Sequence, residues 1–271
     1  MNDFLDVTLL SLLQGVAEFL PISSSGHLVI AGHLLSDGSA LMDKMETIEV
    51  YLHFGTILSV FAFYRRRIAL LLGGALMPGV PREIRKGSWN FIARLIVSAA
   101  PAVPVYFIFK DELDELLTQP VVVGALLTMT GFVLMSTRFI PNGNRKLGFF
   151  AALSMGLGQA VALLPGISRS GMTIAAAKMN SVRNEDIAEF SFLMSAPLIL
   201  GGSLLKLVKD FNASLFSENY SLGTILWGVA LSAVVGYASL AILERVLKGR
   251  RFWLFGVYCA IAGALTVFCL K

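Results

Sequence analysis

Two short stretches carry most of the reactive side chains in this 271-residue sequence. The first, Gln14–His27 (QGVAEFLPISSSGH), holds an acid, three consecutive serines and a histidine inside an otherwise apolar segment. The second, Gln159–Met172 (QAVALLPGISRSGM), shares seven of its first thirteen residues with the first stretch, without a gap. An arginine, Arg169, stands where the first stretch has Ser24. One stretch thus offers an acid and a hydroxyl nucleophile and the other offers a cation, which are the groups that phosphate chemistry uses.

The composition indicates a polytopic membrane protein. Hydrophobic residues make up 56% of the chain and charged residues 15%, and the mean hydropathy is +0.74. A soluble domain with so few polar residues would not cover its own surface, which excludes ordinary globular enzymes. Cys259 and Cys269 lie too far apart along the last apolar segment to form a disulfide within a helix. We expect a single integral membrane domain over residues 1–271, with its first apolar segment retained because it lacks the features of a cleaved signal peptide.

The first half predicts a re-entrant helical hairpin followed by three spans. Phe4–Leu20 is nearly long enough to cross a bilayer, but a proline ends it, and Leu28–Leu35 adds only a short apolar return. Non-helical backbone at this depth requires a protein-lined, wet cavity, so we expect the ISSSG turn to line one. After a polar loop, Ser36–Glu46, three transmembrane helices are expected at Thr47–Tyr64, Phe91–Phe109 and Pro120–Thr137.

The second half repeats this plan. Gly148–Leu164 enters the membrane and breaks at a Pro-Gly pair, and Met172–Ala177 forms the return of a second hairpin. Three more transmembrane helices are expected at Ile187–Val208, Leu222–Leu243 and Trp253–Leu270. The sequence therefore predicts an all-α polytopic membrane protein made of two repeats, about residues 1–140 and 145–271.

The charged loops predict that the two repeats have opposite orientations. Basic residues gather in three loops that are expected in the cytoplasm, around Arg65–Arg67, Arg138–Lys146 and Arg245–Arg251. A loop with four acidic residues at positions 111–115 lacks that excess and is expected outside. With this assignment of the loops, the first hairpin enters the membrane from the outside and the second enters it from the cytoplasm. This is the plan of inverted-topology repeats, whose binding sites lie where the repeats meet near the midplane.

Both hairpin turns have the features of an anion site. In each, a proline ends one helix and serines begin the next, and the free amides of a helix start attract phosphate. Arg169 can bind two phosphate oxygens at once. Glu18 and His27 flank the first run of serines, which is the layout of an activated hydroxyl with proton-transfer partners. Glu49 and Glu189 lie in the spans after each turn and are expected to pair with Arg169 or a cation.

Some of these residues keep a structural interpretation beside the functional one. Ser25 and Ser170 either bind phosphate or only cap their helices. His27 either transfers protons or satisfies backbone carbonyls. His53 is interpreted as a packing or hydrogen-bonding residue.

The same residues resemble the undecaprenyl-diphosphate phosphatase family, the bacitracin-resistance type of integral membrane phosphatase. The family's first signature, (E/Q)xxxE followed by a proline and a serine-rich turn, is matched over residues 14–27. Its second, PGxSRSxxT, is matched at every fixed position by Pro165–Thr173, and an EFSFLxxxP pattern appears at Glu189–Pro197. The likeness extends over essentially the full chain, with two departures. Gln14 stands where many members have Glu, and His53 stands where glutamine is commoner.

The resemblance implies an enzyme that removes the terminal phosphate of undecaprenyl diphosphate and leaves the monophosphate lipid carrier for cell-wall synthesis. It implies a multi-pass protein of the bacterial inner (plasma) membrane with its site toward the periplasm, assisted by a divalent cation, Mg²⁺ or Ca²⁺. The implied catalytic residues are Ser24 as nucleophile, Glu18 as acid/base or metal-facing carboxylate, His27 as a second proton-transfer candidate and Arg169 as phosphate clamp. Phosphate-binding residues are expected to be Ser23, Ser168 and Thr173, with Ser25, Ser170 and Gly166 at the helix starts. Supporting residues are expected to be Gln14, Glu49 and Glu189.

A secondary transporter or flippase for a polyprenyl phosphate lipid is the main alternative, because inverted repeats with broken helices are also a transporter design. The SSSGH motif faintly resembles the PSGH motif of an acid phosphatase superfamily, but no later Arg, His and Asp set follows, so that interpretation is rejected. The expected partners are the polyprenyl diphosphate and membrane lipids, with no nucleic acid. The oligomeric state, monomer or homodimer, stays open, as does the choice between a phosphoserine intermediate and direct attack by water.

Overall fold

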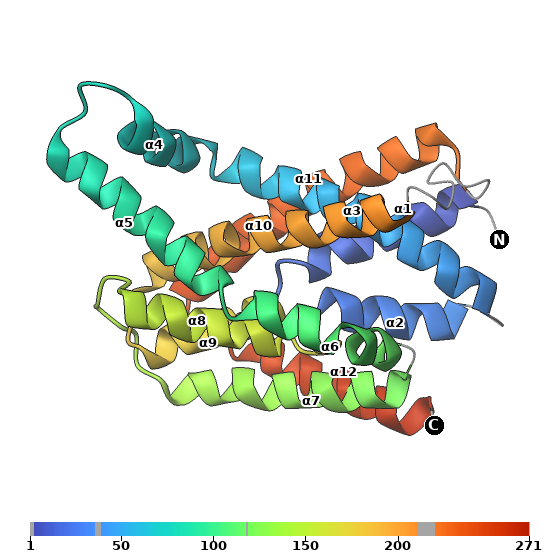
Figure 1. Ribbon diagram of the computed structural model, residues 1–271. Coiled ribbons are helices and arrows are strands. Elements are labelled where there is room, and N and C mark those ends of the chain that lie inside the picture. The colour runs from blue at the N-terminus through green and yellow to red at the C-terminus, as the bar shows by residue number, and fades with distance from the viewer. Residues whose placement is uncertain (1–2, 36–38, 118, 211–219, 271) are drawn as a thin grey trace.

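The computed structural model consists of packed α-helices, shown in Figure 1. It describes residues 3–35, 39–117, 119–210 and 220–270. Over these residues the secondary structure is helical apart from short connections, and its one strand-like feature is an isolated bridge between Arg145 and Val182. The predicted all-helical class is therefore confirmed.

Two helical hairpins stand where the sequence predicts them. The first consists of α1 (Asp3–Ala17) and α2 (Ser24–Leu35), and the second of α8 (Phe149–Val161) and α9 (Arg169–Met179). Each turn contains a proline, which cannot donate the hydrogen bond that would continue the first helix. Figure 1 shows the first hairpin running in from the end of the molecule that holds the N-terminus, and the second running in from the opposite end. Their turns therefore meet in the middle of the molecule.

The remaining helices surround the hairpins. They are α3 (Ser39–Phe63), α4 (Arg65–Leu76), α5 (Arg82–Ala99), α6 (Ala102–Leu116), α7 (Pro120–Ser136), the 3₁₀ helix η1 (Thr137–Phe139), α10 (Asn184–Asp210), α11 (Leu222–Lys248) and α12 (Leu254–Cys269). α1 packs against α11, whereas α8 packs against α5, so each hairpin contacts a helix from the other half of the chain. α7 and α12 approach closely because glycines face each other: a Cβ on Gly131 would lie 2.7 Å from the carbonyl oxygen of Gly256.

Three segments differ from the predictions. The stretch predicted as a polar loop at Ser36–Glu46 is helical from Ser39, as the beginning of α3, and residues 36–38 lie outside the described part. The residues from Arg65 onward form α4 instead of a loop, because their apolar run packs against α5. The span predicted at Phe91–Phe109 is divided between α5 and α6 next to Pro101, where the proline interrupts the helical hydrogen bonds. The acidic residues that follow belong to the last turns of α6.

The exterior of the helical bundle is apolar. Among the described residues, four helical segments are long and apolar enough to cross a membrane: Arg82–Leu113, Pro120–Phe139, Asn184–Leu205 and Leu222–Lys248. Shorter apolar helices lie at Phe4–Ala17, Ile48–Phe63, Phe149–Val161 and Leu254–Cys269. The side chains of Phe132, Phe150 and Phe268 are 63%, 75% and 78% exposed. So much exposed aromatic surface suits contact with lipid rather than water.

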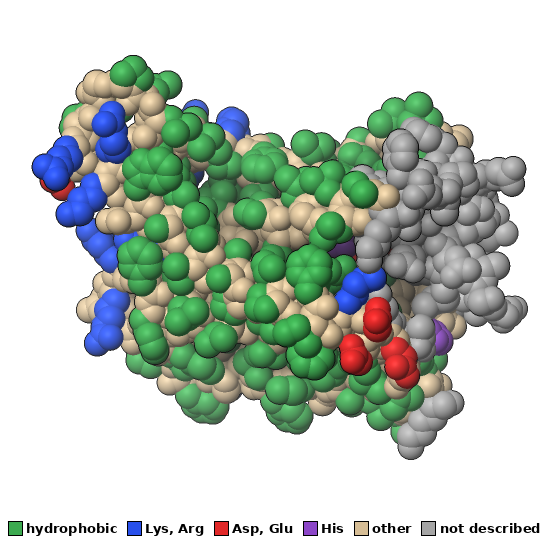
Figure 2. All heavy atoms as spheres, viewed as in Figure 1, with side chains coloured by type: hydrophobic (Ala, Val, Ile, Leu, Met, Phe, Trp, Pro, Cys, Tyr) green, Lys and Arg blue, Asp and Glu red, His purple; other side chains and the backbone are tan. Residues whose placement is uncertain are grey.

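Charged side chains separate toward the two ends of the molecule. On the face shown in Figure 2, Lys and Arg gather over α4, α5 and the connection before α8. Asp and Glu gather near the opposite end, over the last turns of α6. We call the first of these the basic end.

Candidate active site

The two hairpin turns touch each other, which brings both motifs into one region. A Cβ added to Gly26 would lie 3.0 Å from the Cα of Gly166, so glycine permits this contact. Thr130 of α7 holds the second turn. Its hydroxyl donates to the carbonyl of Gly166 at 3.0 Å and accepts from the amide of Ser168 at 3.2 Å. The relative position of the two turns is therefore set by backbone contacts as well as by side chains.

Each turn contains a serine that caps the next helix. Ser23 Oγ accepts from the amide of Gly26 at 3.3 Å, and Ser168 Oγ accepts from the amide of Gly171 at 3.1 Å. The backbones differ, because Ser23 is left-handed with φ 70°, whereas Ser168 is extended with φ −76°. In the second turn the left-handed position falls on Gly166, with φ 92°. A left-handed non-glycine residue costs about 1–2 kcal/mol, so the first turn carries strain that the second avoids.

Glu18 is the centre of the contacts between the turns. Its carboxylate accepts hydrogen bonds from Ser24 Oγ at 2.8 Å, Gln14 Nε2 at 3.1 Å and Arg169 Nη2 at 2.7 Å. The side chains of Arg169 and Glu18 are 14% and 5% exposed, so this ion pair is largely shielded from water. Removing either partner of such a pair leaves the other charge buried without compensation. The acid and hydroxyl of the first turn and the cation of the second are thus brought together.

The residues beside Glu18 fix its direction. Its amide donates to the carbonyl of Gln14 at 2.9 Å, which continues the helical pattern just beyond α1. The next residue, Phe19, is fully buried and packs edge to face on Phe192 of α10, with ring centroids 5.5 Å apart. Because Phe19 is anchored in the core, the preceding side chain is left facing the second turn.

Arg169 has one donor to spare. Its Nη2 donates to the carboxylate and the carbonyl of Glu18, while its Nη1 is buried and has no hydrogen-bond partner in the described part of the chain. Buried polar atoms nearly always have a partner, so this donor is available to an anionic ligand. Arg169 is also the first residue of α9, where the amides of the helix start add positive potential.

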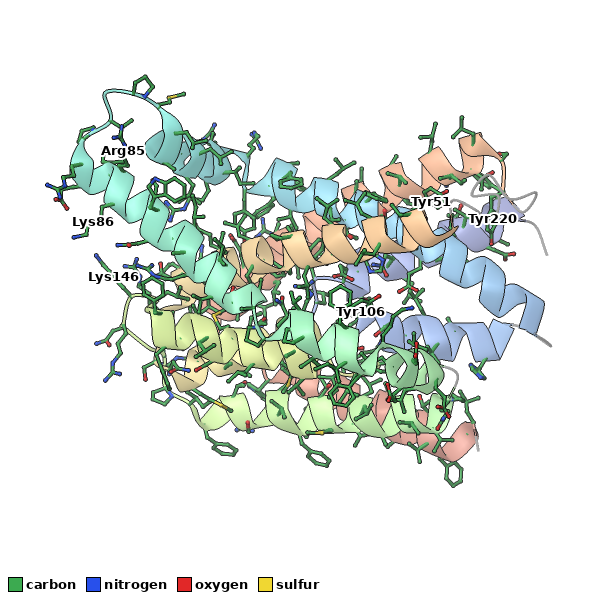
Figure 3. The ribbon with its side chains drawn as sticks, in the orientation of Figure 1. Tyr51, Arg85, Lys86, Tyr106, Lys146 and Tyr220 are labelled. Carbon is green, nitrogen blue, oxygen red and sulfur yellow. The ribbon has the colours of Figure 1, made fainter. Side chains whose placement is uncertain are left out.

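A cavity of about 210 Å³ opens beside these groups. Its polar lining consists of Glu18, Ser23, Ser24, Ser25, Glu49, His53, Ser168 and Arg169. Its apolar lining includes Leu163 and Leu198, which it shares with a largely apolar cavity of about 250 Å³. Tyr106 of α6, labelled in Figure 3, lines that apolar cavity. A polar cavity that adjoins an apolar one suits a ligand with an anionic head and a hydrocarbon tail.

His27 is not among the residues that line the polar cavity. Its Nδ1 lies 2.9 Å from the carbonyl oxygen of Ser23, and its Nε2 lies 2.7 Å from the hydroxyl of Tyr258 on α12. Both ring nitrogens therefore have partners, and neither partner is Glu18. A part for His27 in proton transfer stays a prediction.

Three of the residues predicted to bind phosphate support the second turn and do not line the cavity. Thr173 is fully buried, with its hydroxyl 2.7 Å from that of Ser191. Ser170 is buried, with its hydroxyl 3.3 Å from that of Ser168. A Cβ at Gly166 would collide with the backbone of α7. These residues hold the conformation of the turn that presents Ser168 to the cavity.

Glu189, which was expected to pair with Arg169 or a cation, pairs with Arg67 of α4. Its carboxylate accepts from Arg67 Nε at 2.7 Å. The cavity is reached by α10 at Leu198, nine residues farther along, which corresponds to roughly 13 Å of helix. The contact with Arg169 is not made because Glu189 lies near the start of α10. Glu49, by contrast, lines the cavity as expected of a supporting residue.

His53, interpreted from the sequence as a packing or hydrogen-bonding residue, also lines the cavity. Its Nε2 lies 3.6 Å from Glu18 Oε2, and its Nδ1 lies 3.0 Å from the carbonyl oxygen of Glu49. The sequence did hold a signal for this position. Residues four apart on a helix lie on the same face, so His53 is expected to lie beside Glu49.

The oxygen ligands near the cavity suit a cation that arrives with phosphate. Glu18 and Glu49 line the cavity, and Gln14 Oε1, beside Glu18, is buried without a partner among the described residues. Over those residues no cluster of three or more His, Cys, Asp or Glu forms a complete metal site. Mg²⁺ in phosphate sites is commonly held by one or two carboxylates, with the rest of its ligands from phosphate and water. The residues present fit that kind of binding.

The chain is similar to one protein family and to several named relatives over nearly its whole length. A profile described as bacitracin resistance protein BacA matches residues 7–265, which include both hairpins. The undecaprenyl-diphosphatase of Rhodopirellula baltica is 36% identical over 271 residues, covering 98% of each chain. The protein of the same name from Salinibacter ruber is 34% identical over 271 residues, again covering 98% of each chain. That from Thermotoga maritima is 33% identical over 261 residues, covering 95% of this chain and 97% of the relative.

Proposed function

This chain belongs to the bacitracin resistance protein BacA family, and from that premise we propose that it hydrolyses undecaprenyl diphosphate to undecaprenyl phosphate and inorganic phosphate. The reaction returns the lipid carrier of cell-wall synthesis to its monophosphate form. One observation carries the proposal: Glu18 contacts both Ser24 and Arg169, which joins an acid, a hydroxyl and a phosphate-binding cation in one shielded place.

The terminal phosphate of the substrate is proposed to bind at Arg169. The unpartnered Nη1 and the amides at the start of α9 are donors for its oxygens. An incoming phosphate competes with Glu18 for the guanidinium. As the ion pair with Arg169 weakens, the carboxylate beside Ser24 becomes a stronger base. The carboxylate would therefore take the proton of Ser24 readily only when a phosphate is bound at Arg169.

Ser24 is proposed as the nucleophile. Its Oγ lies 2.8 Å from Glu18 Oε2, so Glu18 can accept the hydroxyl proton as Oγ bonds to the terminal phosphorus. The bond from that phosphorus to the bridging oxygen breaks, and undecaprenyl phosphate leaves with the electron pair. Water then attacks the phosphoserine, the bond between phosphorus and Ser24 Oγ breaks, and Glu18 returns its proton to Oγ. One proton of the water stays on the inorganic phosphate that is released, and the other passes to solvent. Arg169 stabilises the charge on the phosphoryl oxygens in both steps.

Direct attack of water on the diphosphate is the variant of this mechanism without a covalent intermediate. It would use Glu18 as the base and Arg169 as the clamp, with Ser24 as a hydrogen-bond donor to the phosphate. The two routes differ in whether Ser24 becomes phosphorylated.

A divalent cation, Mg²⁺ or Ca²⁺, is proposed to accompany the diphosphate, with Glu18 and Glu49 as its protein ligands. When bound, it would neutralise part of the charge on the phosphate oxygens. The buried oxygen of Gln14 beside Glu18 is a further acceptor in the same place.

The isoprenoid chain is proposed to leave the polar cavity through its apolar neighbour. Leu163 and Leu198 separate the two spaces, and Tyr106 and Phe107 of α6 line the apolar one. Phe107 is 64% exposed, so this route reaches the lipid-facing surface. The tail then lies in the bilayer, and the protein needs to enclose only the diphosphate and the first isoprene units.

The two halves are proposed to be inverted repeats in the bacterial inner membrane. The opposed directions of the two hairpins and their packing on helices of the other half support this plan. The basic end is proposed to face the cytoplasm, because Lys and Arg are enriched in cytoplasmic loops. The cavity at the turns is proposed to open toward the periplasm, because its lining residues Glu49 and His53 lie in the half of α3 farther from Arg65 and the basic end.

The test is phosphate release from undecaprenyl diphosphate by the purified protein in detergent. Wild type is expected to release phosphate, and Ser24→Ala and Arg169→Ala are expected to abolish the release. Ser136→Ala, at an exposed position at the end of α7 and not among the residues that line the cavity, is the matched control and is expected to leave the rate unchanged. Transfer of intact lipid across a vesicle membrane without phosphate release would contradict the hydrolase and favour a flippase.

A further inference from the structure

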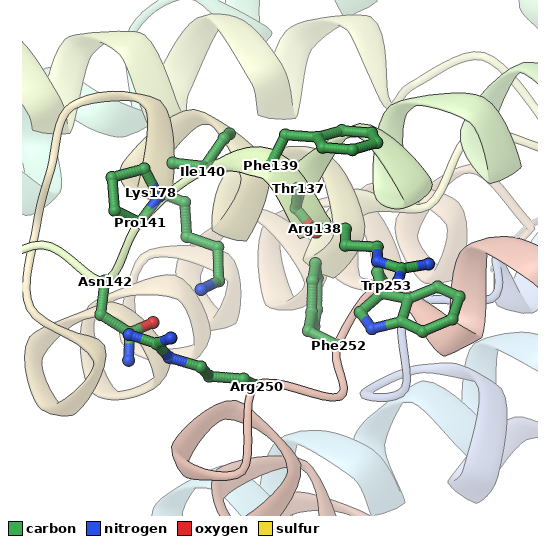
Figure 4. Close-up of a pocket in the computed structure, with 10 residues that line it drawn as sticks. All are labelled: Thr137, Arg138, Phe139, Ile140, Pro141, Asn142, Lys178, Arg250, Phe252 and Trp253. Carbon is green, nitrogen blue, oxygen red and sulfur yellow. The ribbon is translucent and has the colours of Figure 1, made fainter.

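A second polar cavity lies at the basic end, away from the hairpin turns (Figure 4). It measures about 170 Å³ and forms where three segments meet: η1 with the loop after it, the last turn of α9, and the connection between α11 and α12. None of its lining residues also lines the cavity that contains Glu18. The proposed hydrolysis does not use it.

All charged side chains that line this second cavity are basic. They are Arg138, Lys178 and Arg250, and none of its ten described lining residues is acidic. In Figure 4 the ammonium of Lys178 points into the space between Arg250 and Phe252. Among the salt bridges of the described residues, none involves these three cations. The cavity therefore collects positive charge without a counter-charge from the protein.

The burial of Lys178 makes this uncompensated positive charge energetically unfavourable. It is only 5% exposed, and its Nζ has one neutral partner, Asn184 Oδ1, at 3.4 Å, near the limit for a hydrogen bond. A buried ammonium is stable when an anion or several good acceptors surround it. One weak acceptor leaves two donors of Lys178 directed at the cavity, so an anion would complete the cluster.

The two arginines reach the cavity from different segments of the chain. The guanidinium of Arg138 lies over the ring of Trp253, 4.7 Å from its centroid, which fixes the cation beside an aromatic wall. Arg250 has φ 57°, a strained conformation for a residue with a side chain, in the turn after α11. Three like charges from separate segments therefore line one cavity in the free protein.

Aromatic residues connect the cavity to the lipid-facing surface. Phe139 lines the cavity and is 85% exposed, and Trp253 also lines it. Basic residues together with tryptophan are typical of the level of lipid headgroups. A free phosphate ion would use the cations but not the exposed Phe139, whereas a lipid phosphate would use both.

We propose that this cavity binds the phosphate headgroup of an anionic membrane lipid, at a site separate from the hydrolytic one. The phosphate would lie among Arg138, Lys178 and Arg250, and the acyl chains would run along Phe139 and the outer face of α7. The site belongs to the leaflet at the basic end and is independent of the proposed phosphatase activity.

The test measures lipid binding by native mass spectrometry of the full chain in detergent. The probes are phosphatidic acid, phosphatidylcholine with the same acyl chains, and inorganic phosphate. Each basic residue near a lipid surface contributes about fivefold in affinity, so Arg250→Gln should weaken phosphatidic acid binding about fivefold and the triple variant Arg138→Gln/Lys178→Gln/Arg250→Gln about 100-fold. The matched control is Arg65→Gln/Arg66→Gln/Arg82→Gln, which removes three exposed charges at the same end but outside the cavity.

Preferential binding of phosphatidic acid that the cavity variants lose and the control retains would support the proposal. If the control variant lost as much affinity for phosphatidic acid, the effect would be one of overall charge, and the proposal would be overturned. Equal binding of phosphatidylcholine, or displacement of the lipid by inorganic phosphate at the same concentration, would also overturn it. Arg250 is exposed, so its single variant keeps the test decisive if the buried Lys178→Gln change prevents folding.

Discussion

The turn before α2 and the turn before α9 begin their helices with the same device and present different chemistry. In both, a serine hydroxyl accepts from the amide of a glycine three residues later, at 3.3 Å for Ser23 and 3.1 Å for Ser168. The next residue is Ser24 in the first turn and Arg169 in the second. Both side chains reach Glu18, Ser24 at one carboxylate oxygen and Arg169 at the other. A shared cap thus positions a hydroxyl from one turn and a cation from the other around one carboxylate.

The turns also differ in how they are supported. The second is braced by Thr130 of α7 and takes its left-handed conformation at a glycine, Gly166. The first takes its left-handed conformation at Ser23, which lines the cavity. Strained backbone in proteins is often found at functional sites. The comparison supports the proposal that the first turn supplies the reactive groups and the second binds phosphate.

The largest effect is expected from Ser24→Ala, which removes the proposed nucleophile of the first turn. The rate constant for phosphate release should fall by about a thousandfold or more, because loss of a nucleophile usually removes most of the catalytic advantage. Ser136→Ala, outside the cavity lining, is again the control and should change the rate by less than about fivefold. Trapping of phosphoserine at position 24 by acid quench and mass spectrometry would establish the covalent route, and a fully active Ser24→Ala would contradict it.

The next largest effect is expected from Arg169→Lys, which keeps the charge of the second turn but removes the paired donors. The value of kcat/KM should fall by about 100-fold, because an ammonium cannot bind two phosphate oxygens as a planar guanidinium does. Steady-state kinetics with a polyprenyl diphosphate would measure it. Arg67→Lys, at the other arginine–glutamate pair, is the control and should retain activity. A variant at position 169 with normal kcat/KM would mean that Arg169 has only a structural part.

Gly166→Ala tests the rigidity of the second turn. The change adds a side chain at φ 92° against the backbone of α7, so the free energy of unfolding should fall by about 2–4 kcal/mol. Gly79→Ala is the control, because Gly79 has φ 78° but nothing within 4 Å of an added Cβ, and it should lose only about 1 kcal/mol. Thermal unfolding in detergent would measure both. Equal losses would show that the contact with α7 adds nothing to the stability of the turn.

The smallest effects are expected from the two histidines near the first turn. His53→Ala should lower kcat by about tenfold, since His53 Nε2 lies 3.6 Å from the carboxylate of Glu18. His53→Gln should be nearly normal, because an amide can occupy the same place. His27→Ala should change kcat by less than about threefold, since its ring faces Tyr258. The opposite ranking in a kinetic assay would restore His27 as the proton-transfer residue.

Much of the site could be predicted because its residues lie in two local motifs. Glu18, Ser24 and Arg169 were recognisable as an acid, a hydroxyl and a cation in apolar surroundings, where each is costly unless it has a function. The part played by Ser170 and Thr173 was not predictable, because capping, core hydrogen bonding and phosphate binding use the same hydroxyl group. His53 was missed because its partner Glu18 is distant in the sequence. The cluster of Arg138, Lys178 and Arg250 was missed for the same reason, since three separate segments supply it.

By itself, the sequence determined that this is a helical membrane protein with two broken hairpins, because hydropathy, proline and serine act locally along the chain. It also determined which reactive groups each turn carries. Only the tertiary structure decided that Glu18 lies between Ser24 and Arg169, that Glu189 pairs with Arg67, and that His27 faces α12. These pairings depend on the length of each helix and on which of its faces is buried. The distances between the paired side chains are fixed only when the helices pack together.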